Sequence, residues 1–514
     1  MHSYYFTEEH DLFRQSFRNF LEKEAMPYID QWEEDRRIPR SIWKKMGEMG
    51  FLGLSFPEKY GGMGLDFFYD VVFNEELGRC NSGGFAITQQ VTQYMAGPYI
   101  SKYGSDYLKD KYLPGLISGD LICSIGITEP GAGSDVQNIQ TKAVRQGDHY
   151  IVNGSKTFIT NGVYGDFIIT VVKTNPAAGA AGVSLLVIEQ SMEGVSTRKL
   201  KKLGWHASDT AEISFDNVKV PVENLVGDEG RGFYYLMNGL QLERIIGLPA
   251  AISTMEVAIQ KSMQYMSERK AFGRPINKFQ VLRHRIAQLS SEVEAQKAFV
   301  YNCCRMYGDG IYDVKLCSMA KLLVTELSEK VATQCLQFYG GYGFMEEYPM
   351  ARMYRDVRVC TIGGGSSEIM REIIAKMLIE DVGYKAAKGS NETAASPSPK
   401  KVETTNDKLT SVTKAALSFE QLVNGIQQQA TKANPLGKTL KFDMGGQQLY
   451  IDGTGDQNVV SADGNGADCT VNITYDDFQS LIKGELNPMS AFMSGKLKVD
   501  GDMGVAMKLQ QLFS

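Results

Sequence analysis

Residues Thr361–Met370, TIGGGSSEIM, form a glycine-rich segment that a ligand could approach closely, yet no side chain before Glu368 could accept a proton. Glu368 itself follows Ser366, which is expected to cap a helix, and acidic residues in a first turn are stabilised by the helix dipole. We therefore predict a structural role for Glu368. Either a catalytic base lies elsewhere in the chain, or the chain is not an enzyme.

A better candidate for a base lies on the helix predicted from GFYYLMNGLQLERIIGLPAAIS. Helical spacing places Glu243 on the same apolar stripe as Leu236, Leu240, Gly247 and Ala251. A carboxylate on an apolar face is costly unless it is paired or functional. The residues alone leave both interpretations open: Glu243 pairs with a basic side chain, or it works as a general base.

Four other segments combine glycine breaks with groups that could touch a cofactor. ITEPGAGSD, 127–135, is a loop whose small residues admit a ligand, although most such loops simply turn. Its Glu129 precedes a proline and is expected to face outward. FIT, Phe158–Thr160, offers an aromatic ring and a hydroxyl to a flat ring system. ERKAFGRPINKFQ, 268–280, and QFYGGYGF, 337–344, each break a helix at glycine.

The elements that must position these residues change type along the chain. With 514 residues, about three to four domains are expected. Residues 1–121 show helical spacing, 122–231 show period-2 alternation, and 232–384 return to helical spacing, which suggests a bundle. In the middle segment, Asn153-Gly154 and Asn161-Gly162 are strong hairpin signals.

Composition narrows the functional class. The net charge is −6 and no basic block is present, which argues against nucleic acid and anionic membranes as main partners. The eight cysteines lack CxxC spacing and are expected to be free buried thiols, and the five histidines show no helical ligand spacing, so no metal is predicted. No signal peptide or transmembrane segment is recognised, so a cytoplasmic location is expected.

Composition changes at residues 385–408, which contain no aromatic residue and are expected to form a flexible linker. Residues 409–514 then form a separate small α+β unit. LKFDMGGQQLYIDG and DCTVNITY alternate as strands, and YDDFQSLIKG, NPMSAFMSG and GDMGVAMKLQQLF are typical of short helices. Met489, Met493, Met503 and Met507 on these helices could line an adaptable apolar surface or simply fill a core.

In order and spacing, the motifs of residues 1–384 resemble the acyl-CoA dehydrogenase family, as do KLGWHASDTAEISFDNVKVPVENLVG and GGSSEIMREIIA. The resemblance implies an all-α N-terminal domain, a β-barrel-like middle domain and a C-terminal four-helix bundle, with FAD held between domains and subunits of a homotetramer or homodimer. The residues that would flank the isoalloxazine are Thr128, Ser134, Phe158 and Thr160. Those that would reach the pyrophosphate and adenine are Arg269, Phe272 and Gln280, with Gln337 and Gly341 contributed by a neighbouring subunit. Ser366 and Glu368 would close the site.

The resemblance also bears on the base. Gly364 stands where much of the family has its glutamate, and its backbone N–H would remain as an oxyanion donor. The isovaleryl-CoA and long-chain branches share the "GG" of this loop and place their base in the "ER" dipeptide that matches Glu243-Arg244. We therefore predict Glu243 as the base. Arg244 and Ser134 are expected to contact or orient the substrate.

Residues 409–514 resemble a second family, the sterol carrier protein type-2 fold, most clearly over 467–510. That likeness implies binding of a fatty acyl chain, acyl-CoA or sterol. Together the two resemblances imply FAD-dependent α,β-dehydrogenation of a fatty acyl-CoA, with electrons passed to an electron-transferring flavoprotein. Alternatives are an acyl-CoA oxidase that uses oxygen, a flavin hydroxylase, and a non-catalytic lipid-binding scaffold with a decayed flavin site.

Overall fold

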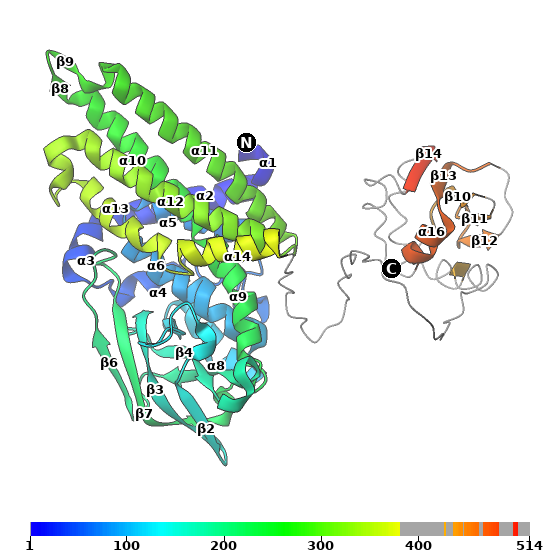
Figure 1. Ribbon diagram of the computed structural model, residues 1–514, viewed down its shortest axis with the longest axis horizontal. Coiled ribbons are helices and arrows are strands. Elements are labelled where there is room, and N and C mark those ends of the chain that lie inside the picture. Colours follow the sequence, from blue (N-terminus) through cyan, green and yellow to red (C-terminus); the bar gives the residue numbers. More distant parts are fainter. Residues whose placement is uncertain are drawn as a thin grey trace, which may run out of the picture. The chain divides into compact units, whose positions relative to one another are not determined.

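The computed structural model describes residues 2–380, 426–427, 435–445, 447–461, 466–482 and 497–501. The chain divides into two compact units, Met1–Gly389 and Ser390–Ser514. In the first unit, a large β-sheet follows one group of helices in the sequence and precedes a second group, and Figure 1 shows this sheet at the lower end of the unit. This is the helical, β, helical order predicted from the spacing of apolar residues.

The N-terminal helices pack around aromatic side chains. Phe17 and Leu21 of α2 are fully buried, and Thr7 caps this helix by accepting a hydrogen bond from the His10 backbone N–H. The elements are α1 (His2–Tyr5), α2 (Glu8–Glu24), η1 (Met26–Tyr28), α3 (Ile29–Asp35), α4 (Arg40–Glu48), η2 (Glu58–Tyr60), α5 (Phe67–Arg79), α6 (Gly83–Gln90), the π-helical η3 (Val91–Ala96), α7 (Gly97–Tyr103) and α8 (Asp106–Ser118).

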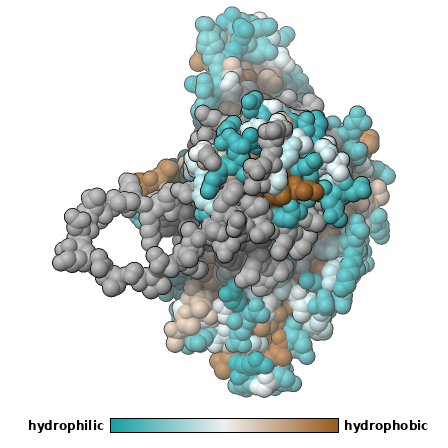
Figure 2. All heavy atoms as spheres, turned by 90° about the vertical axis from the view of Figure 1, so that its right-hand side faces the viewer, coloured by the Kyte–Doolittle hydropathy of each residue, from teal (hydrophilic) through white to brown (hydrophobic). Residues whose placement is uncertain are grey.

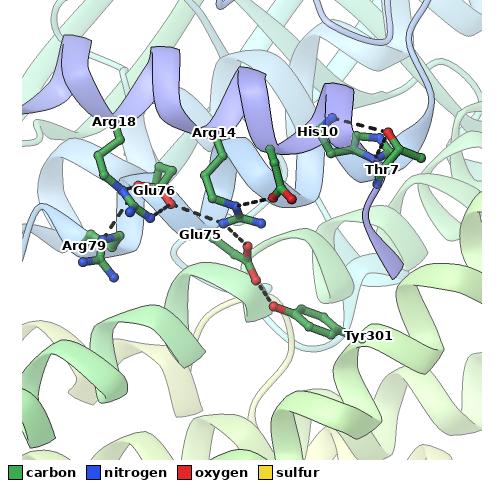
Figure 3. A network of polar contacts seen from close by, with 9 residues as sticks. Thr7, His10, Arg14, Arg18, Glu75, Glu76, Arg79 and Tyr301 are labelled. Atoms are coloured by element: carbon green, nitrogen blue, oxygen red, sulfur yellow. Dashed lines mark hydrogen bonds and ion pairs between the residues drawn. The ribbon is translucent and has the colours of Figure 1, made fainter. Parts of the chain in front are cut away.

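A buried network of charges fastens α2 to the rest of the unit (Figure 3). Arg14 Nη1 lies 2.6 Å from Glu75 Oε2, and Arg18 Nη2 lies 2.7 Å from Glu76 Oε1. Both carboxylates belong to α5, and Glu75 also accepts a hydrogen bond from the hydroxyl of Tyr301 in the C-terminal bundle. Because each buried carboxylate has a cationic partner, the network joins three helices without leaving a bare charge.

The middle strands form one seven-stranded sheet in the order β1-β4-β2-β3-β7-β6, with β5 paired to β4. Apolar residues pack on both of its faces. The strands are β1 (Cys123–Gly126), β2 (Lys142–Gln146), β3 (His149–Thr160), β4 (Phe167–Lys173), β5 (Val183–Glu189), β6 (Val195–Lys199) and β7 (Thr210–Pro221), with short helices η4 (Val136–Asn138), η5 (Pro176–Gly182) and η6 (Val222–Asn224).

Neither Asn-Gly pair forms the predicted hairpin. Asn153-Gly154 lies inside β3 at a shift in register against β7, and a Cβ on Gly154 would lie 2.5 Å from Thr141 Oγ1. Asn161-Gly162 follows β3, but the next strand, β4, does not pair with it. The hairpin between β2 and β3 turns instead at Gly147-Asp148. The glycine at 154 therefore serves a bulge and a close approach, which a local turn signal does not reveal.

The C-terminal helices pack around a core that includes Met255, Val324 and Val331. The long helices α10, α11 and α12 run side by side (Figure 1). The elements are α9 (Gly232–Ile246), α10 (Leu248–Glu268), β8 (Lys270–Ala271), β9 (Arg274–Pro275), η7 (Ile276–Lys278), α11 (Gln280–Gly308), α12 (Val314–Tyr339), η8 (Gly340–Phe344), α13 (Pro349–Val357), η9 (Arg358–Thr361) and α14 (Ser367–Ile379).

Among its described residues, the second unit has a five-stranded sheet in the order β12-β11-β10-β13-β14, in which only the β10–β13 pair is parallel. Its core includes Phe442, Val471 and Phe478. The described elements are β10 (Thr439–Asp443), β11 (Gln448–Asp452), β12 (Val459–Ser461), β13 (Cys469–Ile473), α16 (Tyr475–Ile482) and β14 (Leu497–Gly501). These confirm the strands predicted in LKFDMGGQQLYIDG and DCTVNITY. The predicted linker at 385–408 and the four methionines lie outside the described residues.

The prediction about the cysteine side chains is also tested. All eight cysteines are free thiols, and all but the half-buried Cys360 are buried, as expected. In the part of the chain that the structure describes, no helix is both long enough and apolar enough to cross a membrane. Among the residues that are coloured in Figure 2, hydrophilic ones predominate and hydrophobic ones form small separate groups.

Candidate active site

Glu243 lies in the last turn of α9, with its carboxylate largely surrounded by protein. Tyr99 of α7 donates a hydrogen bond from its hydroxyl to Glu243 Oε1 at 3.2 Å. Burial raises the pKa of Glu243 to about 7, although the Tyr99 hydrogen bond and the charge of Arg244 act in the opposite direction. The side chain is half-buried rather than wholly excluded from solvent. A carboxylate of this kind can exchange a proton near neutral pH.

Lys321 connects α12 with the glycine-rich segment. Its ammonium group, on α12, donates a hydrogen bond to the Gly365 carbonyl oxygen. Burial and the nearby positive charge of Arg244 lower the pKa of Lys321 to about 8. Gly364 has φ 64°, and a Cβ placed there would meet no atom within 4 Å. Lys321 thus holds the loop that lacks a carboxylate against α12, and α12 packs against α9, the helix that carries Glu243.

The predicted flavin loop and the FIT segment lie together in the β domain. The backbone N–H of Thr157 donates to the Thr128 carbonyl oxygen at 2.8 Å, which ties the 127–135 loop to β3. Phe158 sits where the β3–β7 register shifts, with φ 62°, and 69% of its surface is exposed. The bulge therefore turns this ring out of the sheet. Thr160, two residues on, is half-buried, and Ser134 is exposed at the end of the loop.

The expectation that Glu129 faces outward is wrong. Glu129 is buried, and its Oε1 lies 2.7 Å from the ammonium group of Lys156, which is wholly buried. The backbone N–H groups of Gln140 and Thr141 also donate to this carboxylate. The period-2 pattern of β3 carried a signal for the pair, because it places Lys156 on the same inward face as Tyr150 and Val152, where an ammonium group needs a partner.

Asn161 fixes the end of the FIT segment to the N-terminal helices. Its Nδ2 donates to the carbonyl oxygen of Thr88 at 3.0 Å, to Thr92 Oγ1 at 3.2 Å and to the carbonyl oxygen of Cys123 at 3.3 Å. Thr92 belongs to η3, the segment that leads directly into α7 and Tyr99. The exposed Phe158 ring and the hydroxyl that contacts Glu243 are therefore held by one framework.

The other predicted cofactor residues lie at the far end of the bundle. Figure 1 shows the β8–β9 hairpin, which carries Phe272, at the end of α10 remote from the large sheet, and a helix of 21 residues spans about 30 Å. The Arg269 guanidinium carbon lies 5.8 Å from the centre of the Tyr342 ring, beside Gly341. Gln280, at the start of α11, and Gln337, near the end of α12, are both exposed.

Ser366 and Glu368 take the local roles predicted for a helix start. Ser366 caps α14 by accepting a hydrogen bond from the Ile369 backbone N–H, and Glu368 lies in the exposed first turn. Contacts with its own backbone N–H and with Ser366 hold the pKa of Glu368 below its usual value. An acid that stays ionised in solvent is poorly suited to accept a proton at neutral pH.

Two phenylalanines suit the binding of a flat cofactor. Phe158 and Phe272 both adopt left-handed backbone conformations, and their exposed fractions are 69% and 94%. Bulky residues rarely adopt such conformations, which concentrate at ligand sites. The Phe158 ring lies in β3 beside the small-residue loop, and the Phe272 ring lies in the β8–β9 hairpin beside Arg269. An exposed aromatic ring can stack on the ring system of a dinucleotide, and nearby backbone N–H groups or a guanidinium can bind its phosphates.

Neither Tyr99 nor Lys321 is predicted from the sequence. Lys321 had a weak signal, since it interrupts the apolar side of α12. Tyr99 had none, because an aromatic residue in a helical domain is usually part of a core.

Comparison with known proteins agrees with this architecture. The chain matches the acyl-CoA dehydrogenase N-terminal domain over residues 7–120, the middle domain over 124–218 and the C-terminal domain over 230–379. Residues 419–514 match the SCP-2 sterol transfer family.

Similar proteins include the mitochondrial long-chain specific acyl-CoA dehydrogenase of Rattus norvegicus, 40% identical over 73% of this chain and 88% of the relative. The mitochondrial isovaleryl-CoA dehydrogenase of Oryza sativa is 36% identical over 73% of this chain and 92% of the relative. The crystal structure of an acyl-CoA dehydrogenase from Geobacillus kaustophilus superimposes with a TM-score of 0.71 at 46% identity, covering 73% of this chain and 99% of that one. The chain thus belongs to the acyl-CoA dehydrogenase family of CH–CH oxidoreductases, which typically use FAD, and it carries an appended SCP-2 lipid-binding domain.

Proposed function

We propose that this chain oxidises a long fatty acyl-CoA to the α,β-unsaturated thioester, with Glu243 as the base. The observation that supports this most directly is the enclosed Glu243 carboxylate, whose pKa burial raises to about 7. It replaces the carboxylate that the glycine-rich loop lacks at Gly364. Similarity to a long-chain specific dehydrogenase favours a long acyl chain over a short one.

Glu243 would take the proton from the carbon next to the thioester carbonyl. This proton is far less acidic than a carboxylic acid, so the base needs help from donors that stabilise the enolate-like oxygen. One well-placed donor lowers such a barrier by about 3–4 kcal/mol. The backbone N–H of Gly364 would serve as one donor, and Lys321 would hold the loop by its bond to the Gly365 carbonyl. Arg244 and Ser134 would orient the substrate.

FAD, when bound, would accept the hydride from the β carbon. Thr128, Ser134, Phe158 and Thr160 would lie against its ring system, with Ser366 and Glu368 at the edge of the site. A cofactor that also touches Arg269, Phe272 or Gln280 must reach the opposite end of a bundle whose helix α10 alone spans about 30 Å.

We propose that Arg269, Phe272 and Gln280 reach the cofactor from a neighbouring subunit of a homodimer or homotetramer. Because Arg269 and Tyr342 are adjacent within one chain, Gln337 and Gly341 would come from the same neighbour as Arg269. This differs from the division expected from the sequence, in which only Gln337 and Gly341 cross between subunits. The expected cytoplasmic location stays a prediction.

Reduction of the bound cofactor tests the proposal. The purified protein is expected to be yellow and to bleach anaerobically with a long acyl-CoA, faster than with short or branched ones in a panel. Reoxidation by an electron-transferring flavoprotein without hydrogen peroxide would identify a dehydrogenase. Peroxide formed at each turnover would identify an oxidase instead. A purified protein that binds lipid but is colourless, and so has no flavin to bleach, would contradict the enzymatic proposal.

For the SCP-2 domain we propose a role in presenting or receiving acyl chains that dissolve poorly in water. The fusion itself supports this, because a covalent connection keeps two sites near millimolar effective concentration, of the order expected for a short flexible tether. Removing residues 385–514 is expected to lower turnover of long acyl-CoA at limiting substrate but not at saturation. Equal turnover by both proteins at limiting substrate would contradict the role.

A further inference from the structure

The hydrogen bond between Tyr99 and Glu243 joins two helices that are distant in sequence. Tyr99 is almost fully buried, and α9 packs against both η3 and α7. Its hydroxyl donates to Glu243 Oε1 at 3.2 Å. Burial, followed by the charge of Glu243, raises the pKa of Tyr99 well above its usual range, so the phenol stays protonated. It is a permanent donor aimed at the carboxylate.

The sequence of α9 contains a glycine that this contact requires. Gly239 lies one turn before Glu243, in the middle of the helix, where glycine is less favourable than every residue except proline. A Cβ at Gly239 would lie 2.1 Å from the Tyr99 hydroxyl oxygen and 2.5 Å from its ring carbon Cζ. Any side chain at 239 would therefore displace Tyr99 from the carboxylate.

The segment before Tyr99 also departs from a regular helix. Residues Val91–Ala96 form a π-helix, and Gly97 and Pro98 then begin the α-helix α7. A π-helical segment holds an extra residue and shifts the face on which later side chains lie, and such segments are frequent at functional sites. We infer that Tyr99 is a positioning residue for the proposed base: its hydroxyl, admitted by Gly239, orients the Glu243 carboxylate and stabilises its ionised form.

This inference rests on the proposed function. The other charged groups around Glu243 do not take the place of the Tyr99 hydrogen bond. Arg244, on the same helix, is the other group that favours the anion. From α12, Cys317 and Lys321 lie near Arg244. Titratable groups on the other elements around α9 have partners of their own. Tyr94 of η3 contacts Asp70 of α5, and Tyr103 of α7 accepts a hydrogen bond from Asn238. The remaining contacts are those of Glu75 and Glu76 of α5 with Arg14 and Arg18, of Tyr301 of α11 with Glu75, and of Glu256 of α10 with Lys297 of α11.

The test is the variant Tyr99→Phe, which removes the hydroxyl and keeps the ring. The acid limb of the kcat/KM profile is expected to move up by about one pH unit, because a hydrogen bond to a charged group typically changes an equilibrium by about tenfold or more. Tyr103→Phe is the matched control, since it removes a neighbouring half-buried hydroxyl that bonds to Asn238 instead, at 3.3 Å. That control should leave the profile in place.

A second variant addresses Gly239. Gly239→Ala is expected to shift the acid limb in the same direction as Tyr99→Phe, and adding it to Tyr99→Phe should produce no further shift. The protonation of Glu243 can also be followed without turnover, from the infrared carbonyl band of its carboxylic acid, assigned by its loss in Glu243→Gln. If Tyr99→Phe left both the acid limb and this band at the pH of the unaltered protein, Tyr99 would have no positioning role.

The two proposals fail separately. If Glu243→Gln still bleached at the normal rate, the assignment of the base would be wrong, and the Tyr99 inference would fall with it. If Glu243→Gln lost bleaching while Tyr99→Phe kept the normal profile and band, only the inference about Tyr99 would be overturned. Retention of the yellow cofactor in each variant shows that the fold is intact.

Discussion

Lys156 and Glu129 form an ion pair in which the ammonium side chain is wholly buried and lies 2.7 Å from the carboxylate oxygen. The pair joins β3, two residues before the exposed Phe158, to the loop that carries Thr128 and Ser134. Burial alone would raise the pKa of Glu129, but the charge of Lys156 and several hydrogen bonds hold that pKa below its usual value. Burial lowers the pKa of Lys156 to about 8, so the pair is charged at neutral pH and fixes the loop against the strand.

Glu129→Gln is expected to destabilise the protein because it leaves the Lys156 ammonium group buried without a counter-charge. The cost should be about 3–5 kcal/mol in the free energy of unfolding. Chemical denaturation measures it, and weaker retention of the cofactor should accompany it. The double variant Glu129→Gln with Lys156→Met removes both charges and should recover most of the stability. A single variant as stable as the unaltered protein would contradict this account.

Glu243→Gln is expected to keep the fold and the cofactor while slowing anaerobic bleaching by about a hundredfold to ten-thousandfold, the usual contribution of a general base. The amide is isosteric and can still accept from Tyr99, so the loss would reflect proton transfer alone. Rapid-mixing absorbance with excess acyl-CoA measures it. Glu372→Gln, at an exposed position on α14, is the control and should bleach normally.

The rate should depend on pH in the direction set by the base. Burial raises the pKa of Glu243 from the ordinary carboxyl range to about 7, and the base works only when ionised. We therefore expect kcat/KM to rise about tenfold per pH unit below that value and to level off above it. A profile taken with parallel melting curves separates this titration from acid unfolding. An acid limb near the ordinary pKa of glutamate would mean that another group limits the rate.

Asp356 couples stability to pH at the junction of three parts of the first unit. Its carboxylate on α13 accepts from the backbone N–H groups of Gly83 at 3.0 Å and Trp205 at 2.6 Å. Burial, followed by the charge of Glu33, raises its pKa to about 7. Because the folded-state pKa lies above the unfolded value, its favourable contribution is complete below about pH 4 and is lost as the pH rises through about 7.

Asp356→Asn should reveal this coupling. The amide offers one acceptor oxygen to two N–H donors, so the variant is expected to lose about 1–3 kcal/mol at acidic pH. Its melting temperature should then fall less between about pH 6 and 8 than that of the unaltered protein, since no carboxyl remains to ionise. Parallel slopes for the two proteins across this range would rule out Asp356 as the titrating group.

Much of the architecture could be predicted from the sequence because it depends on the spacing of apolar residues. Helical spacing before 122 and after 231, with alternation between them, follows from which face of each element must be buried. Ser366 and Thr7 could be predicted as helix caps, since capping depends on a few adjacent residues. Glu243 was identifiable as unusual, because an acid on an apolar stripe is costly, but its spacing alone did not separate a base from a paired carboxylate.

Only the tertiary structure decided what surrounds each of these groups. Asn153-Gly154 has the local signature of a turn, yet the approach of Thr141 makes it a bulge. Glu129 lies in a loop, yet it is buried beside Lys156 of β3, whose ammonium group needs a counter-charge. Tyr99 lies 144 residues before Glu243, and only the packing of α7 on α9 brings its hydroxyl to the carboxylate. Local patterns depend on neighbours in sequence, whereas the pKa of a buried acid depends on neighbours in space.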